Sequence, residues 1–278
     1  MNKTHYNEGM ARHEITFRRV VCERPGMRDV PIRRDIEYAQ TDAGPLTMDL
    51  YAPPGPGSTQ PRPAVVLVGG YRDVGVPLAL GCTGKEMEMV ISWAQLIAVS
   101  GLVAISYTRQ DPARDARRLF EFVGANAESL GVDANRIGVW AASGNGPVAL
   151  SLLMNDAPVK VACAVLCYAF TLDASGATSV AEASAAWHFA NPTAGRTVAD
   201  MHNDIPLFIA RAGADSFQGL NAALDRFIQD ALARNLPLTI VNAALAPHAF
   251  DLFDDSDASR HIVEMVLTFL RHHLTGAQ

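Results

Sequence analysis

The chain has 278 residues, 49% of them hydrophobic and 19% charged, with a formal net charge of −6. This composition supplies a large apolar core, and the length is compatible with a single α/β domain. An acidic chain without a basic block is not expected to bind nucleic acid or an anionic membrane. Residues 1–19 carry charges and histidines and lack an apolar stretch, which predicts no signal peptide. Four cysteines without metal-site spacing fit a reducing, cytoplasmic location.

Residues 1–31 show only weak periodicity and are expected to form an N-terminal extension, in which residues 14–21 could be a short strand or an arm. Residues 32–40 and 46–51 then flank a turn-rich Thr-Asp-Ala-Gly-Pro joint. This pattern predicts a β-hairpin at the start of the main domain, which is expected to span residues 32–278.

Apolar segments of strand length alternate with helical segments through the rest of the chain. Asp111 and Pro112 offer an N-cap and a first-turn proline for one of the helices. The alternation predicts parallel βαβ units, and therefore an α/β fold with helices on both faces of the sheet. The expected strands are residues 64–69, 102–107, 137–142, 160–170, 206–212 and 237–242. The expected helices are residues 86–100, 111–130, 147–154, 217–234 and 256–273.

Residues 171–204 depart from this alternation, because they are long for a connection between two strands and contain one helical piece, residues 180–190. Loops of this length inside a compact domain are often lids or binding walls, so a cap-like insertion is expected here. Trp187, His188 and Phe189 are its candidate contributions to an apolar substrate pocket. Packing of a surface helix is an equally weighted alternative for these three side chains.

Ser143 lies in the joint between the strand at residues 137–142 and the helix at residues 147–154, flanked only by very small residues and Asn145. A strand that turns directly into a helix must bend sharply, and bulky side chains there would collide. The serine at such a bend has its hydroxyl exposed above the sheet, which is the geometry of a nucleophile elbow. The alternative is a joint with an incidental serine, so the rest of the chain must supply a base, an acid and an oxyanion hole.

Two further polar residues follow expected strands. Asp215 comes after residues 206–212, and His248 comes after residues 237–242. Because the carboxyl ends of parallel strands meet at one edge of a sheet, both side chains are expected near Ser143. An activated serine needs a base and an acid that orients the base, and the order Ser143, Asp215, His248 is the order expected of this architecture.

Other acids and histidines have weaker claims. Asp173 follows the preceding expected strand and is a second candidate for the orienting acid. The histidines His5, His13 and His202 have no strand-end position. The histidines His261, His272 and His273 lie on or near the last helix and are expected to be surface or packing residues. Four acids after His248 are expected to cap the last helix, because carboxylates favour a helix N-terminus. These are Asp251, Asp254, Asp255 and Asp257.

An oxyanion hole needs two backbone N–H groups that point toward the developing negative charge. Gly144, directly after the serine and at the start of a helix, is expected to supply one. The turn after residues 64–69 should supply the other, from Tyr71 with Gly70 as the alternate. A tight glycine turn without this role is the alternative. The glycines lack the spacing of a dinucleotide-binding loop, and no His/Cys cluster indicates a metal.

From residue 32 to the C-terminus the chain resembles the α/β-hydrolase superfamily, and within it the dienelactone hydrolase-like and small carboxylesterase-like group. The resemblance rests on Gly69-Gly70-Tyr71, Arg136-Ile-Gly-Val-Trp-Ala-Ala-Ser143-Gly-Asn-Gly146, Ala212-Gly-Ala-Asp215 and Pro247-His248-Ala-Phe-Asp251. It implies a three-layer αβα sandwich with a mostly parallel eight-stranded sheet and a short cap segment. It also implies Ser143 as nucleophile, Asp215 as orienting acid and His248 as base. Family members act without cofactors on esters, lactones, thioesters or, less often, peptides.

Two positions depart from the family pattern. The usual Gly-x-Ser-x-Gly reads Ala141-Ala-Ser-Gly-Asn145. Asn145 tolerates left-handed backbone better than most residues, and its side chain could reach the substrate or hydrogen-bond near the oxyanion. Gly69 stands where the family commonly has the histidine of a His-Gly pair, which removes a side chain that usually braces this loop.

The sequence therefore predicts a serine hydrolase that cleaves a carboxylic ester, lactone or thioester of a small molecule through an acyl-enzyme on Ser143. The same triad could instead serve a peptidase, a C–C hydrolase or an acyltransferase, because fold alone does not determine the reaction. A non-catalytic ligand-binding protein is a further alternative. No cofactor or metal is expected, and the protein is expected to be a monomer or a homodimer.

Overall fold

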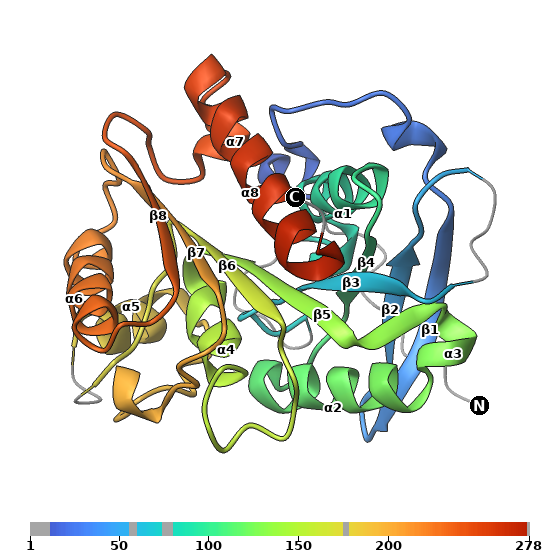
Figure 1. Ribbon diagram of the computed structural model, residues 1–278, viewed down its shortest axis with the longest axis horizontal. Coiled ribbons are helices and arrows are strands. Elements are labelled where there is room, and N and C mark those ends of the chain that lie inside the picture. Colours follow the sequence, from blue (N-terminus) through green and yellow to red (C-terminus); the bar gives the residue numbers. More distant parts are fainter. Residues whose placement is uncertain (1–11, 56–59, 74–79, 175–177, 277–278) are drawn as a thin grey trace.

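The computed structural model describes residues 12–55, 60–73, 80–174 and 178–276, so residues 1–11 of the expected extension and 175–177 of the expected cap lie outside it. An eight-stranded sheet forms its centre, in the order β1-β2-β4-β3-β5-β6-β7-β8 (Figure 1). The strands are β1 (Ile32–Thr41), β2 (Gly44–Tyr51), β3 (Arg62–Leu67), β4 (Val103–Tyr107), β5 (Val132–Ala142), β6 (Cys163–Cys167), β7 (Leu207–Ala212) and β8 (Leu238–Ala243).

The predicted hairpin and the predicted parallel sheet are both confirmed. β1 pairs with β2 antiparallel, and Thr41 lies opposite Gly44 at the turn. β2 is also antiparallel to β4, whereas β3 to β8 run parallel to one another. The carboxyl ends of these six strands therefore share one edge of the sheet, where loops can bring side chains together.

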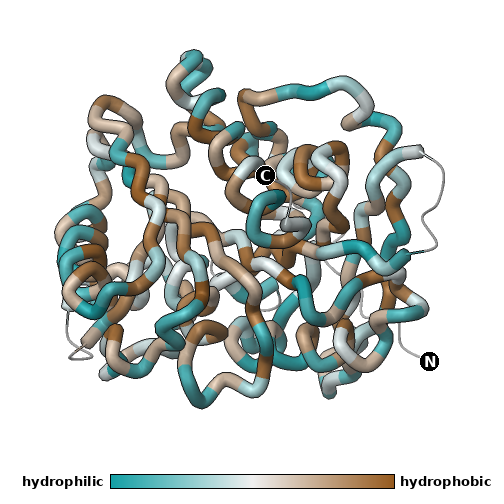
Figure 2. The backbone as a smooth tube through the Cα atoms, viewed as in Figure 1, coloured by the Kyte–Doolittle hydropathy of each residue, from teal (hydrophilic) through white to brown (hydrophobic). Residues whose placement is uncertain are grey.

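Helices cover both faces of the sheet (Figure 1). Alternate residues of the parallel strands point to opposite faces, so each face has its own core. One core contains α1 and α8, and the other contains α2, α4 and α6. In Figure 2, hydrophilic residues colour much of the outer helix α6, whereas the central strands are mostly pale to brown. The principal helices are α1 (Glu88–Val99), α2 (Pro112–Ala125), α4 (Gly146–Ser151), α5 (Ser179–Trp187), α6 (Leu220–Ala233) and α8 (Asp257–Thr275).

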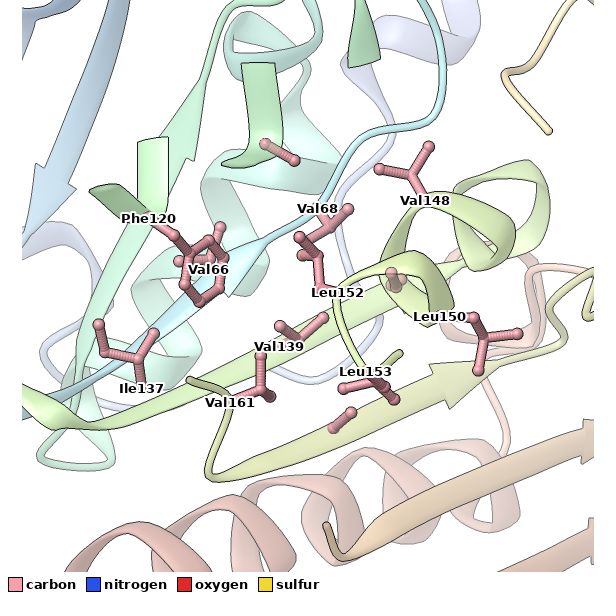
Figure 3. Packing of buried hydrophobic residues seen from close by; sticks show 14 of the residues in the cluster. Val66, Val68, Phe120, Ile137, Val139, Val148, Leu150, Leu152, Leu153 and Val161 are labelled. Carbon is pink, nitrogen blue, oxygen red and sulfur yellow. The ribbon is translucent and has the colours of Figure 1, made fainter. Parts of the chain in front are cut away.

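The core beneath the serine joint is closely filled with aliphatic side chains. Figure 3 shows Leu152, directly after α4, between Val139 of β5 and Val68, directly after β3, with Val148 of α4 on the other side of Val68. All four are fully or almost fully buried. Since packed interiors tolerate little movement, this cluster holds the start of α4 firmly against the end of β5.

Some element boundaries differ from the sequence prediction. Helix α2 begins at Pro112 with Asp111 as its N-cap, as predicted, but a break at Asn126 separates it from α3 (Ala127–Leu130). Strand β6 ends at Cys167, three residues early, because Tyr168 adopts a left-handed backbone with φ of 39° that cannot continue a strand. None of the helices within the described ranges is long and apolar enough to span a membrane.

The described part of the N-terminal extension packs against the main domain. It contains two 3₁₀ helices, η1 (Glu14–Phe17) and η2 (Met27–Asp29), rather than a strand. The Val20 N–H donates to Ser92 Oγ of α1 at 3.1 Å, and Arg24 forms an ion pair with Glu264 of α8. Its buried side chains Val20, Cys22, Met27 and Val30 lie in the same core as α1 and α8. Residues 12–31 are therefore an integral part of the domain.

Candidate active site

Ser143 occupies a sharp turn between β5 and α4. Its backbone has a φ of 54°, a left-handed conformation that non-glycine residues seldom adopt. The flanking small residues are required by close contacts. A β-carbon added at Gly144 would collide with the Tyr71 hydroxyl and Phe189, and one added at Gly146 would collide with the carbonyl of Phe170. The local structure is thus a sharp strand-to-helix turn with the serine at its bend, which is the geometry expected from the sequence.

The structure brings Ser143, His248 and Asp215 into one hydrogen-bonded chain. Ser143 Oγ lies 2.9 Å from His248 Nε2, and His248 Nδ1 lies 2.6 Å from Asp215 Oδ2. The Asp215 side chain is fully buried, and that of His248 is 18% exposed. A carboxylate can only accept, so Nδ1 carries the proton toward Asp215 and Nε2 is free to accept from the serine hydroxyl.

Packing restricts the orientation of both His248 and Asp215. The imidazole lies between Tyr168 and Phe217, with ring centroids 4.9 Å and 4.4 Å away. The second carboxylate oxygen of Asp215 accepts the Phe217 N–H at 2.9 Å. Because each group is held on more than one side, the geometry is organised before any substrate binds.

Tyr71, Gly70 and Gly144, the three residues considered for the oxyanion hole, also lie beside Ser143. The backbone N–H of one of them already donates a hydrogen bond within the protein. The Gly70 N–H donates to Asn145 Oδ1 at 2.7 Å, so the expectation of Gly70 as the alternate donor is wrong. Gly144 lies in the first turn of the 3₁₀ helix η4 (Ser143–Asn145), where N–H groups lack an intrahelical partner. The remaining pair of candidate donors is therefore the N–H groups of Gly144 and Tyr71.

The Tyr71 side chain adds a second polar group to this corner of the site. Its hydroxyl hydrogen-bonds with Ser143, and its ring packs edge-on against Phe189 at 6.1 Å. Burial raises the pKa of Tyr71 to about 12, although the bond with Ser143 opposes the shift. The phenol is consequently neutral near pH 7 and available as a hydrogen-bond donor.

A cavity of about 320 Å³ opens beside Ser143 and His248. Its volume is at the lower end of the range for small-molecule sites. Apolar side chains form most of the wall, and Trp187 and Asn145 are among the lining residues. Ile15 of η1 also lines the cavity, a contribution that the weak pattern at residues 14–21 did not reveal. The apolar lining includes Leu67, Leu80, Met89 and Leu252.

The other two cap residues do not line the cavity. His188 is exposed and ends α5 in a left-handed conformation, so its expected place in the pocket is wrong. Phe189 is 3% exposed and stacks on Phe170 at 5.1 Å, beneath Gly144 and Tyr71. Phe189 therefore supports the elbow from behind. Asp173, the second candidate acid, accepts from Asn191 Nδ2 at 2.9 Å within the cap segment.

One buried carboxylate near the site was predicted for a different role. Asp251 was expected to cap the last helix, but it is 1% exposed and accepts from Trp93 Nε1 at 2.7 Å and from the Tyr168 hydroxyl at 2.6 Å. The cap of α8 comes from Ser256, whose side chain accepts the Ser259 N–H. Tyr168 thus connects Asp251 to the ring of His248.

Among the described residues, His, Cys, Asp and Glu side chains do not gather in groups of three or more that could hold a metal ion. The chemistry that this arrangement supports is attack by an activated hydroxyl on a carbon that develops negative charge on its oxygen.

No protein-family model matches the sequence, and comparison with curated proteins gives no match. Solved structures do match. A bacterial heroin esterase aligns with a TM-score of 0.68 and 16% identity over 89% of this chain and 86% of its own. An esterase from the planctomycete Thermogutta terrifontis gives 0.66 and 19%, over 89% and 94%. Esterase LipW from Mycobacterium marinum gives 0.65 and 18%, over 87% and 81%.

At sequence identities this low, the similarity to these solved structures establishes the architecture of the chain. Together with the strand order and the helices on both faces, it shows that the chain has the α/β-hydrolase fold.

Proposed function

We propose that the protein is a serine hydrolase that cleaves a carboxylic ester, lactone or thioester of a small molecule. The observation that carries the proposal is the hydrogen-bonded chain from Ser143 through His248 to Asp215. Its position beside a largely apolar cavity of about 320 Å³ further supports a small organic substrate. The esterases of the same fold supply an independent argument for ester chemistry.

In the proposed first step, Ser143 Oγ attacks the acyl carbon while its proton moves to His248 Nε2. The carbonyl electrons move onto oxygen, and the N–H groups of Gly144 and Tyr71 stabilise the oxyanion. Asp215 holds the imidazole in the correct tautomer and stabilises the imidazolium. As the intermediate collapses, the bond from carbon to the leaving oxygen or sulfur breaks, and His248 gives its proton to that atom.

In the second step, water takes the place of the leaving group. His248 removes a proton from the water, which attacks the acyl carbon of the acyl-enzyme and forms a second oxyanion. Collapse releases the carboxylic acid product and returns the proton to Ser143 Oγ. The two half-reactions use the same groups, so loss of any one of them should impair both.

The test is Ser143→Ala, assayed for p-nitrophenyl ester turnover and for labelling by a fluorophosphonate. Both should be lost, with a fall in kcat of roughly 10⁴-fold or more, because the proposed acyl-enzyme forms on the Ser143 oxygen. Ser129→Ala is the matched control, since that serine is exposed, does not line the cavity, and its hydroxyl donates to the Asn126 carbonyl at the end of a helix. Wild-type rates or labelling in Ser143→Ala would reject the proposal.

Solved structures of an esterase with the same fold support the choice of a phosphonate and an ester as reagents. Thermogutta terrifontis esterase 2 has been solved phosphonylated by sarin and with bound butyrate. Phosphonates and short acyl chains are therefore suitable first probes. A panel that also includes peptides, C–C bond substrates and acyl acceptors would distinguish esterase activity from use of the same triad as a peptidase, a C–C hydrolase or an acyltransferase. Absence of labelling in the wild type would favour a non-catalytic ligand-binding protein.

We further propose that the protein acts in the cytoplasm, as a monomer or a homodimer. All four cysteines lie in described segments as free thiols, which supports a reducing compartment.

A further inference from the structure

Asn145 stands two residues after Ser143, where the family pattern has a glycine. Its backbone is right-handed, with φ of −81° and ψ of −15°, so the turn itself does not require a residue that tolerates left-handed angles. What asparagine adds is its amide. Oδ1 accepts the N–H of Gly70 at 2.7 Å, across a sequence separation of 75 residues. The bond joins the elbow to the loop that follows β3.

Gly70 is held on two further sides. Its carbonyl accepts the Ala190 N–H of the cap segment at 2.8 Å. Its α-carbon lies so close to the elbow that an added β-carbon would collide with the carbonyl oxygen of Gly144. Three separate segments therefore meet at this glycine, and the contact with Asn145 is the one that a side chain supplies.

These contacts determine where the Tyr71 N–H points. A peptide unit is planar, and in the trans form its N–H and C=O point in opposite directions. The described chain contains no cis peptide bond. The hydrogen bond to Asn145 therefore orients the peptide unit between Gly69 and Gly70. The hydrogen bond from Ala190 orients the next peptide unit, which contains the Gly70 carbonyl and the Tyr71 N–H. That second N–H points away from the cap and is the one assigned to the oxyanion.

We infer that Asn145 is a positioning residue, which holds the loop after β3 so that the Tyr71 N–H meets the oxyanion. The inference rests on the proposed function. It gives a role to the asparagine that departs from the family pattern. The Asn145 amide braces the loop from the elbow side, while the Arg109 guanidinium occupies the space that a side chain at position 69 would fill. Asn145 need not contact the substrate for this role.

The experiment replaces the acceptor in two ways, Asn145→Gly and Asn145→Ala. Both variants should fold, with melting temperatures within about 5 °C of wild type, because one hydrogen bond is lost from a chain of this size. In each, kcat should fall roughly 10- to 100-fold while KM changes less than about threefold, since a misplaced donor weakens the transition state more than the bound substrate. A trifluoromethyl ketone, which forms a hemiketal oxyanion on the serine, should lose affinity in proportion to kcat/KM.

Asn126→Ala is the matched control. That amide donates to the Phe122 carbonyl at 2.8 Å at the end of α2, and its loss should leave kcat unchanged. Wild-type kcat in both Asn145 variants would overturn the inference, as would an equal loss of affinity for the ketone and for a substrate-like ester.

A measurement without turnover separates this inference from the proposed function. Hydrogen exchange at the Gly70 amide, followed by NMR of protein labelled with ¹⁵N-glycine, should be slow in the wild type and at least tenfold faster in Asn145→Gly. Unchanged exchange would refute the role of Asn145 in holding the loop, whatever the enzyme does. A wild type that neither hydrolyses esters nor reacts with a fluorophosphonate would refute the proposed function and, with it, the catalytic part of the inference.

Discussion

Asp251 lies three residues after His248. Among the described residues, no cationic side chain forms a hydrogen bond with its carboxyl group. Its carboxyl accepts from Trp93 and Tyr168, two neutral donors, inside the core. Burial raises the pKa of Asp251, although both hydrogen bonds oppose the shift. The folded state therefore binds this proton more tightly than the unfolded state does, and stability falls as the pH rises from the usual carboxyl pKa to the raised one.

Replacement of Asp251 by asparagine should remove that pH dependence. An amide can still accept from Trp93 and can donate to the Tyr168 oxygen, so the variant should fold. Relative to wild type, its free energy of unfolding should increase from pH 4 to pH 7, as measured by urea unfolding at both values, because only the wild type loses stability over this range.

Asp133→Asn provides a control of opposite sign. A hydrogen bond from Arg136 lowers the pKa of Asp133, so that carboxylate stabilises the fold above its unfolded pKa and loses this effect as the pH falls. The Asp133 variant should therefore become less stable relative to wild type as the pH rises from about 2 to about 5, and the difference should change little from there to pH 7. The same trend in both variants would contradict the reasoning for Asp251.

Ser143, Asp215 and His248 could be located from the sequence because each follows a strand within a few residues, which is a local signal. Asp251 gave no such signal. Its partners are 158 and 83 residues away along the chain, so its environment depends on packing that local patterns do not encode. An acid just before a helix is read as a cap, and here tertiary burial overrides that preference.

At the scale of elements, the short helix η1 contributes the side chain of Ile15 to the wall of the cavity. The His13 side chain accepts the Ile15 N–H at 3.2 Å, and the His13 N–H donates to the Leu80 carbonyl at 3.1 Å. Arg12 donates to the Glu86 carbonyl at 2.7 Å. These contacts fix Ile15 against the cavity, so its size should influence which substrates fit.

Ile15→Trp should shorten the chain that the cavity accepts. Added volume should lower kcat/KM for octanoyl esters by about tenfold or more and leave acetyl esters within about threefold of wild type, because a pocket wall discriminates mainly by size. Acyl and alkyl chain-length series would show which side of the ester the wall contacts. Phe17→Ala is the control, since Phe17 belongs to the same helix but is 57% exposed and does not line the cavity. Equal losses for short and long chains would count against this assignment.

Long elements with a clear period were predictable and short ones were not. The hairpin, the apolar strands and the start of α2 at Pro112 follow from alternation and capping. The helix η1 spans four residues, too few for a period to appear. The early end of β6 depends on the left-handed Tyr168, which its apolar neighbours conceal.

At the scale of the molecule, residues 12–31 complete the core that contains α1 and α8. Met27 is 4% exposed in that core, so Met27→Ala should lower the free energy of unfolding by about 2–5 kcal/mol. Glu23→Ala, an exposed change in the same segment, should stay within about 0.5 kcal/mol of wild type. Urea unfolding of both variants tests whether the segment belongs to the cooperative unit. Two unchanged stabilities would show that it does not.

The docking of this segment also has a consequence for the order in which the molecule is completed during synthesis. Arg24 leaves the ribosome long before its partner Glu264, which follows 240 residues later along the chain. At typical rates of elongation the two are separated by on the order of 10 to 50 seconds. During that interval the apolar side chains around Val20 and Met27 lack part of their final surroundings. Until α8 emerges and closes the core, the nascent chain therefore carries an exposed apolar segment at residues 20–30, a binding site for a chaperone.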